Sequence, residues 1–376
     1  MKPIRMVDLV TQYHKIKPQV DAAVLDIMDR AAFIKGPEVK KFEDNLAQYL
    51  GVKHVIGCAN GTDALQVAMM ALDLQPGDEV ITSCFTYVAT AEVMALLKLK
   101  PVLVDVYPDT FNLNIEEVKK AIGPKTRLIV PVHLFGQCVD MEPLLNIANE
   151  NGIPIIEDTA QAIGATYTFS DGTKHKAGTM GKFGATSFFP SKNLGCFGDG
   201  GAVFTNDDLL AEKIRMICNH GQTRLYYHDF VGVNSRLDTI QAAILDIKLK
   251  QLDNYAKARN FAADAYDLAF ANNAKLIIPK RAKNSSHVFH QYTLRVLDDK
   301  RDSLKSHLES KGIPAMIYYP VPLNKQKAYL QEGHFPVTNQ LCNEVLSLPM
   351  HTELDGEQLN FITQSVNEFF NQAITN

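Results

Sequence analysis

The sequence lacks the features that mark membrane-spanning, secreted and nucleic-acid-binding proteins. No apolar run reaches the roughly 18 residues that a membrane helix needs. The first residues lead into charged ones without an apolar core segment, so we expect no signal peptide. The formal net charge of −4 over 376 residues gives no reason to expect a nucleic-acid partner. We therefore expect a cytoplasmic protein that is long enough for about two domains.

Cysteine is scarce and scattered, which argues against a disulfide framework or a zinc site. The chain has six cysteines and no Cys-x-x-Cys pair, so we expect reduced and mostly buried thiols. The close histidine pair, His287 and His290, has no carboxylate or thiol beside it at ligand spacing. We interpret this pair as structural, and we predict no metal site.

Two common nucleotide-binding motifs are also missing. The turn at 60–63 does not end in the Gly-Lys-Ser/Thr of a Walker A loop, and the glycines at 198–201 do not match Gly-x-Gly-x-x-Gly. A Rossmann dehydrogenase is therefore a weak alternative.

Strand-like and helical patterns alternate through the first half of the chain. The predicted strands are 54–58, 79–82, 101–106, 127–132 and 153–158, and the helices between them are 64–72, 89–99, 115–122 and 141–149. This alternation predicts an α/β protein with a mainly parallel sheet covered on both faces. Ligands in such sheets sit beyond the carboxyl ends of the strands.

The remaining segments predict two domains. Helices are expected at 20–32 and 38–50 before the first strand, and at 207–219, 238–253 and 255–270 after a strand at 202–205. The segment 221–234 is predicted as a loop. We predict a large domain over residues 1–254, including the helical N-terminal segment, and a smaller C-terminal α+β domain over 255–376.

One lysine stands between an aromatic run and a glycine-rich turn, at Lys192. An amine becomes a nucleophile when it is desolvated or lies near other cationic groups. Phe188, Phe189 and Phe197 are candidates for a dry wall around it, and the glycines that follow allow a tight turn. Taken alone, the stretch is more typical of a surface lysine in a loop.

Three further stretches follow predicted strands, and each has a simpler alternative. Asn60–Asp63 opens a helix and provides an anion site, or only a helix cap. The aromatic residues at 85 and 87 are placed to stack on a planar ring, or to fill the core. Asp158 ends a buried strand, where a carboxylate needs a partner such as a protonated pyridine nitrogen or a structural cation. In chain order, the four stretches describe a site for an anionic, planar, aldehyde-bearing cofactor, which is pyridoxal 5′-phosphate (PLP).

These residues resemble the DegT/DnrJ/EryC1/StrS sugar aminotransferases, over nearly the whole chain. The motifs that carry the resemblance are Asn60-Gly61-Thr62-Asp63-Ala64-Leu65, Thr86-Tyr87-Val88-Ala89-Thr90, Glu157-Asp158-Thr159-Ala160-Gln161, Ser187-Phe188-Phe189-Pro190-Ser191-Lys192-Asn193 and Gly232-Val233-Asn234-Ser235-Arg236-Leu237-Asp238. The resemblance implies the PLP-dependent transferase fold type I, with a mainly parallel seven-stranded sheet in the large domain.

The resemblance also implies roles for particular residues. Lys192 is expected to form the Schiff base with PLP and to move protons, and Asp158 to pair with the pyridine nitrogen. The remaining expected cofactor contacts are Gly61, Thr62 and Ser187 at the phosphate, Tyr87 stacked on the ring with Phe85 as the alternative, Gln161 at the phenolic oxygen, and Asn234 at the phosphate of the partner subunit's cofactor. That last contact implies a homodimer with shared active sites. The candidate substrate contacts are Arg236, Tyr318 and Tyr319, and the loop Lys174–Lys176 is either a cationic contact or a solvated turn.

The implied reaction is transamination from L-glutamate to a nucleotide-linked keto-sugar, giving an amino sugar for lipopolysaccharide, O-antigen or another surface polysaccharide. Our best candidate is 3-amination of a UDP-linked 3-keto-N-acetylhexosaminuronic acid. The alternatives are a dTDP-3-keto-6-deoxyhexose aminotransferase, a different PLP reaction such as dehydration or racemisation, and a non-enzymatic regulator with the same fold. A branch of the family that performs dehydration carries histidine at the lysine position, and Lys192 argues against that reaction here.

Overall fold

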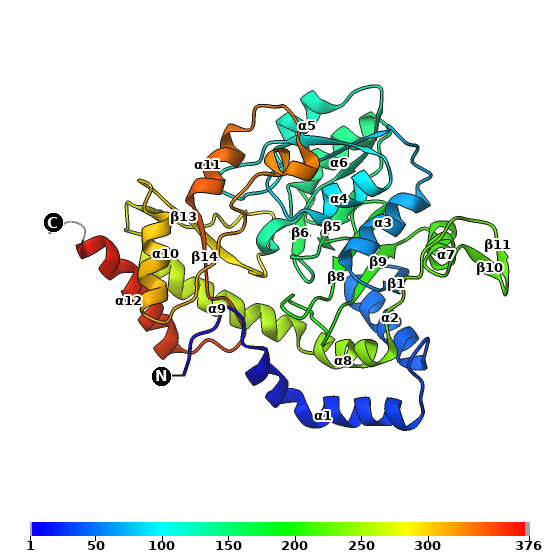
Figure 1. The fold of residues 1–376 in the computed structure, drawn as a ribbon, viewed down its shortest axis with the longest axis horizontal. Helices are drawn as coiled ribbons and strands as arrows, with labels where there is room; N and C mark the ends of the chain where they lie inside the picture. Colours follow the sequence, from blue (N-terminus) through cyan, green and yellow to red (C-terminus); the bar gives the residue numbers. More distant parts are fainter. Residues whose placement is uncertain (1, 373–376) are drawn as a thin grey trace.

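The computed structural model describes residues 2–372, and within this range seven strands form one row across the molecule (Figure 1). Their spatial order is β1 (His54–Cys58), β9 (Gly201–Thr205), β8 (Phe183–Ser187), β5 (Ile156–Asp158), β4 (Thr126–Val130), β2 (Glu79–Ser83) and β3 (Lys100–Val104). Parallel bridges between Ile129 and Ile155 and between Val132 and Asp158 join β4 to β5. Only β9 runs antiparallel to its neighbours. The predicted mainly parallel, seven-stranded sheet is confirmed.

Helices cover both faces of this sheet. Successive residues of its strands point to opposite faces and are apolar on both, so each face needs a helical cover. The helices of the large layer are α2 (Pro37–Leu50), α3 (Gly61–Ala71), α4 (Ala89–Leu96), α5 (Ile115–Ala121), α6 (Met141–Glu150), α7 (Asp208–Ile217) and α8 (Thr239–Leu249). Val80 packs with α3, α4 and α7, whereas the next residue, Ile81, packs with α5 and α6. In the same way, Val203 and Phe204 face opposite helical layers.

The first helix begins earlier than the apolar pattern indicated. The helix predicted at 20–32 is α1 (Leu9–Asp29), which contains Pro18 and packs along α8. The Asp8 carboxylate caps it by accepting a hydrogen bond of 3.1 Å from the Thr11 N–H. The cap and not the apolar spacing sets where this helix starts.

A second layer follows the long helix α9 (Leu252–Phe270). It contains a three-stranded antiparallel sheet of β12 (Leu276–Ile277), β13 (Tyr292–Val296) and β14 (Val345–Leu348), with α10 (Arg301–Ser310), α11 (Pro336–Glu344) and α12 (Gly356–Gln372). One apolar core joins α9, α10 and α12 to these strands. Figure 1 draws this group together, apart from α3 and α7. The division into residues 1–254 and 255–376 stays a prediction, and α9 runs across that boundary.

Several short elements were not predicted. The strand β8 was missed although it is central, and the segment Lys174–Lys176, predicted as a loop, is strand β7 of a hairpin with β6 (Thr166–Thr168). The predicted loop 221–234 contains a small hairpin of β10 (Gln222–Arg224) and β11 (Tyr227–His228). Three short 3₁₀ turns, η1 (Leu134–Gly136), η2 (Leu323–Lys325) and η3 (Lys327–Tyr329), complete the described elements. Strands of two or three residues are too short to show a period in the sequence.

The state of the cysteines agrees with the prediction. All six are free and buried. Among residues 2–372, no helix is both long and apolar enough to cross a membrane.

The carboxylate of Glu157 organises the backbone at the end of β5. It is fully buried and accepts hydrogen bonds from the N–H groups of Gly178 (2.8 Å), Met180 (2.6 Å) and Gly181 (2.6 Å). The His133 Nε2 lies 2.9 Å from the same carboxylate, and His133 Nδ1 accepts a hydrogen bond from the Val139 N–H. His133 therefore donates from Nε2. These bonds hold the loop before β8 against β5.

We predict that Glu157→Ala lowers the free energy of unfolding by about 3–5 kcal/mol, because it leaves several buried donors without an acceptor. Urea unfolding followed by circular dichroism measures this change. Glu150→Ala, at the exposed end of α6, is the matched control and should change stability by less than about 0.5 kcal/mol. Equal midpoints for the two variants would contradict the assignment.

Candidate active site

Asp158 lies at the carboxyl edge of the sheet, as the last residue of β5. It is 7% exposed, and its carboxylate accepts hydrogen bonds from the Thr90 hydroxyl (3.1 Å) and the Ala160 N–H (3.0 Å). Burial raises the pKa of Asp158, while the Ala160 hydrogen bond and the charge of Lys192 oppose that rise. A buried carboxylate with few donors is suited to a cationic partner.

Lys192 reaches the same edge from the loop after β8. Burial lowers the pKa of the Lys192 amine to about 8, and attraction to Asp158 opposes this shift. The loop turns tightly here, because a Cβ at Gly195 would lie 2.4 Å from the Pro190 carbonyl oxygen. The structure therefore brings the predicted lysine and the predicted ring acid together, and it desolvates the amine.

The aromatic wall predicted around Lys192 is only partly present. Phe188 is buried against Phe42, with ring centroids 5.4 Å apart. Phe189 and Phe197 are exposed. The three rings therefore do not enclose the amine together, because the loop turns the last two outward.

The predicted phosphate residues meet at the first turn of α3. The Asn60 side chain caps this helix by accepting a hydrogen bond of 2.8 Å from the Asp63 N–H. The N–H groups of Gly61 and Thr62 have no acceptor in the part of the chain that the structure describes. A Cβ at Gly61 would lie 2.6 Å from the Ser187 Cβ, so only glycine lets β8 approach this closely. Two free N–H groups at a helix N-terminus, beside a hydroxyl, form an anion site.

The two aromatic candidates differ in their surroundings. Phe85 is 1% exposed and packs against Phe111, Phe135 and Tyr319. Tyr87 is 57% exposed, with its ring centroid 6.3 Å from that of Tyr319. Only Tyr87 has a ring that a planar ligand can reach, so the geometry favours it over Phe85.

Gln161 is buried and connects three parts of the site. Its side-chain oxygen accepts a hydrogen bond from the Phe135 N–H (2.8 Å), and its amide donates to the Tyr319 hydroxyl (3.2 Å). Burial raises the pKa of the Tyr319 hydroxyl. Tyr318 directly precedes Tyr319 and is half-buried. Tyr319 therefore belongs to the site of Lys192 and Asp158.

Asn234 and Arg236 are both accessible to solvent in their own chain. Asn234 is exposed, and its side chain makes no hydrogen bond with any described residue. Arg236 is half-buried and has no ion pair within residues 2–372. The cationic contact predicted at 174–176 is weakened, because Lys176 donates to the Gly164 carbonyl and lies over the Tyr49 ring.

Sequence reasoning missed Thr90 and His290. Thr90 lies inside a motif that was noted only for its aromatic residue. His290 is buried, and the nearby charges of Lys192 and Arg259 add to burial in holding its pKa well below the ordinary value. The Asn193 amide donates to the Val288 carbonyl (2.9 Å) and so ties the lysine loop to the segment that carries His290. No local signal in the sequence connects residues about 100 positions apart.

The arrangement fits PLP. An anion site, a reachable ring, a buried carboxylate and a desolvated amine lie at one edge of the sheet. The buried Thr86 hydroxyl, Asn193 side-chain oxygen and His290 Nδ1 have no hydrogen-bond partner among the described residues, which is typical of a site that a ligand completes. The residues present match a phosphate, a planar ring with a basic nitrogen, and an aldehyde.

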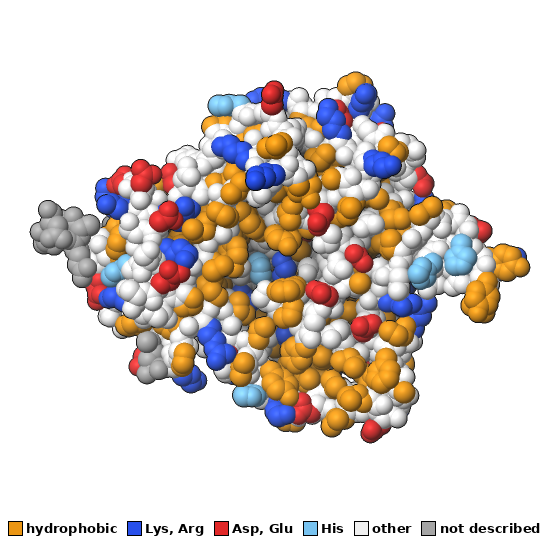
Figure 2. All heavy atoms as spheres, viewed as in Figure 1, with side chains coloured by type: hydrophobic (Ala, Val, Ile, Leu, Met, Phe, Trp, Pro, Cys, Tyr) orange, Lys and Arg blue, Asp and Glu red, His pale blue; other side chains and the backbone are white. Residues whose placement is uncertain are grey.

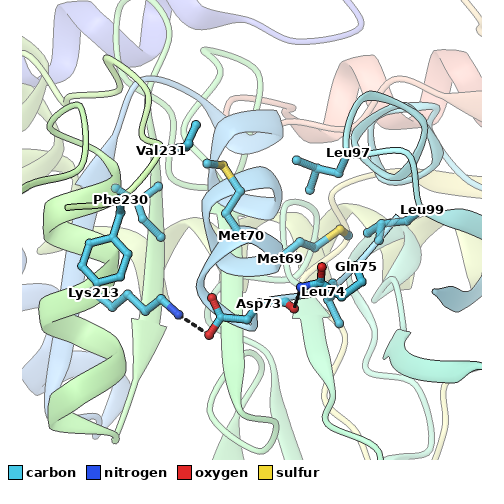
Figure 3. Close-up of a pocket in the computed structure, with 11 residues that line it drawn as sticks. Met69, Met70, Asp73, Leu74, Gln75, Leu97, Leu99, Lys213, Phe230 and Val231 are labelled. Carbon is cyan, nitrogen blue, oxygen red and sulfur yellow. Dashed lines mark hydrogen bonds and ion pairs between the residues drawn. The ribbon is translucent and has the colours of Figure 1, made fainter. Parts of the chain in front are cut away.

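A separate hollow of about 370 Å³ contains none of these residues (Figure 3). It lies between α3, α7 and the loop that carries Phe230, and an ion pair of 2.5 Å between Lys213 and Asp73 crosses it. Met69, Met70 and Leu97 make its wall largely apolar.

Known proteins resemble this chain over nearly its whole length. The model of the "DegT/DnrJ/EryC1/StrS aminotransferase family" matches residues 14–367. A curated Pseudomonas aeruginosa protein, "UDP-2-acetamido-2-deoxy-3-oxo-D-glucuronate aminotransferase", is 47% identical over 96% of this chain and 98% of its own length. A "pleiotropic regulatory protein" of Geobacillus stearothermophilus is 44% identical over 98% of each chain. The structure of Streptomyces venezuelae DesV "in complex with ketimine intermediate" has a TM-score of 0.93 and 38% identity, covering 98% of this chain and 99% of that one.

We predict that the Lys192 amine of cofactor-free protein reacts with a pulse of acetylating reagent to half its maximal extent near pH 8. A protonated amine does not react, and an ordinary lysine titrates near about 10.4. Mass spectrometry of the digest measures labelling at each lysine, so the exposed lysines serve as internal controls.

Asp158→Asn should move this half-point to lower pH, because the carboxylate favours the protonated amine. A half-point near that of the exposed lysines would show that Lys192 is solvated, contrary to this structure.

Proposed function

Because this chain belongs to the DegT/DnrJ/EryC1/StrS aminotransferase family, we propose that it transfers the amino group of L-glutamate to a nucleotide-linked keto-sugar. Family membership confirms the predicted enzyme class and cofactor, so the chain is a PLP-dependent aminotransferase. The observation that carries the proposal is the pairing of a desolvated Lys192 with a buried Asp158 at the sheet edge.

The proposed acceptor is a UDP-linked 3-keto-N-acetylhexosaminuronic acid, aminated at carbon 3. The name of the P. aeruginosa relative supports this choice, at 47% identity over almost the whole chain. The product would be an amino sugar for lipopolysaccharide, O-antigen or another surface polysaccharide, made in the cytoplasm. The regulatory relative supports a second candidate, a regulator with this fold, and Lys192 and Asp158 together argue against it.

Each residue of the site would have a distinct role in holding the cofactor. When bound, PLP supplies the aldehyde that takes up the amino group and the ring that accepts electron density. The N–H groups of Gly61 and Thr62, with the Ser187 hydroxyl, would hold the phosphate. The Asp158 carboxylate, oriented by Thr90 and Ala160, would keep a proton on the ring nitrogen.

Lys192 would act as the acid and base for the substrate carbon. An amine with a pKa of about 8 is able both to accept and to release a proton near neutral pH. Tyr87 would cover the ring, and Gln161, fixed by Phe135 and Tyr319, would lie at the phenolic oxygen. Tyr318, Tyr319 and Arg236 are the proposed contacts of the sugar.

We further propose that two chains share each site. Asn234 and Arg236 have no side-chain partner among residues 2–372 of their own chain. The hairpin of β10 and β11 beside them projects from the molecule (Figure 1) and exposes Leu225 (70%) and Tyr226 (82%). A second copy that covers this hairpin would bring Asn234 to the partner's phosphate site and would bury these apolar side chains.

The first test is the absorbance spectrum of the PLP-loaded protein before and after L-glutamate. We expect the visible band of the lysine-bound cofactor to be replaced by near-ultraviolet absorption, with release of one equivalent of 2-oxoglutarate; D-glutamate is the control. Lys192→Ala should abolish turnover, and Lys125→Ala, at an exposed position before β4, should not. A visible band that ignores L-glutamate would indicate another donor or reaction, and the absence of a band would favour the regulator.

Sharing of sites predicts complementation between two defective variants. Lys192→Ala removes the amine from its own site, whereas Asn234→Ala weakens the partner's cofactor site. In a refolded equal mixture, half of the dimers are mixed and each has one intact site, so activity at limiting PLP should reach about a quarter of the unmodified level. No activity above that of the separate variants would mean that Asn234 serves its own chain.

A further inference from the structure

A second hollow, of about 580 Å³, lies beside the loop that carries Tyr87. Val88, Lys325, Gln326, Lys327, Ala328 and Tyr329 line it, and we call it the basic hollow. Val88 directly follows Tyr87, the reachable aromatic residue of the site, and ends the loop after β2. The hollow therefore lies at the same carboxyl edge of the sheet as Lys192 and Asp158.

The charged side chains that line the basic hollow are all cationic. Lys325 and Lys327 are exposed, and neither forms an ion pair with any of the described residues. Its lining includes no carboxylate. Glu92 of α4 is the acidic group that influences Tyr329, whose pKa burial and this charge raise. In Figure 2, basic side chains lie over the segment before α11. Two unpaired cations in a concave surface attract an anion.

The segment that carries these lysines is fixed to the active-site edge. The Leu323 N–H donates to the Cys84 carbonyl (3.1 Å), and the Cys84 thiol lies 3.3 Å from the Asn324 side-chain oxygen. The Gln331 N–H donates to the Asn324 carbonyl (3.1 Å) and so closes the turn. The same chain segment begins with Tyr318 and Tyr319, and the Tyr319 hydroxyl accepts a hydrogen bond from Gln161 of the candidate site. One segment therefore spans from the reaction site to the basic hollow.

We propose that the basic hollow binds the diphosphate of the nucleotide-linked sugar, with Lys325 and Lys327 as the cations that hold it. This inference rests on the proposed function, because it concerns the acceptor of that reaction. The keto-sugar must place its reacting carbon, C3, at Lys192, and the diphosphate is attached to C1 of the same ring, two ring atoms away. The cationic hollow includes Val88, which directly follows Tyr87, so it is placed to receive that charge, and the Leu323–Cys84 hydrogen bond keeps the segment in place.

Binding of UDP to the PLP-loaded protein, measured by isothermal titration calorimetry, tests the proposal without turnover. Lys325→Gln and Lys327→Gln should each weaken UDP binding about fivefold, because each removes one partly screened charge contact. The double variant should lose about 25-fold if the two contacts act independently, and the double Lys→Arg variant should bind close to normally. Lys125→Gln, at the opposite edge of the sheet, is the control and should bind UDP normally.

Comparing UDP, uridine and pyrophosphate distinguishes a site for a nucleotide diphosphate from a site for free phosphates. UDP should bind more tightly than uridine, which lacks the phosphates, and more tightly than pyrophosphate, which lacks the nucleoside. Equal affinity for pyrophosphate would indicate a site for free phosphates and would overturn the proposal. The proposal would also be overturned if UDP does not bind, or if it binds to all variants with equal affinity. The L-glutamate test of the proposed function needs no nucleotide, so either idea can fail while the other stands.

Discussion

The structure depends on the placement of one carboxylate and one amine at the carboxyl edge of a mainly parallel sheet. Asp158 ends β5, and Lys192 follows β8, the strand paired with it in parallel. Burial acts on both groups in the direction that favours their neutral forms, and their mutual attraction opposes it. An amine held in this balance is able to exchange protons near neutral pH, and the carboxylate keeps its capacity to hold a cation.

The rest of the fold keeps this pair in register. Glu157 fixes the loop before β8 to the end of β5, so the strand that leads to Lys192 cannot shift relative to Asp158. Asn193 binds the Val288 carbonyl, and Arg259 donates to the carbonyls of Phe289 (3.0 Å) and Met350 (3.0 Å). Through these bonds, the C-terminal layer becomes a wall of the site.

Much of the site was predictable because its residues lie in short local motifs. Asp158, Ser187 and Gly61 each occupy a strand end or a helix start, and Lys192 lies in the loop that follows β8. Parallel strands bring such positions to one edge. His290 and Tyr319 were different. From the sequence, His290 was interpreted as half of a structural pair. The hydrogen bond between Tyr319 and Gln161 joins residues that lie far apart in the chain. Neither contact has a local pattern, because only packing of the C-terminal layer on the sheet creates it.

Local pattern alone established the α/β class, the alternation of strands and helices, and the types of residue available for chemistry, since periodicity and turn residues act within a few positions. Tertiary structure decided which aromatic ring is reachable, because Phe85 and Tyr87 differ only in what surrounds them. It also decided the protonation balance of Lys192 and the outward exposure of Asn234. Burial and charge at a point depend on every segment that packs there, and no single stretch of the sequence contains that information.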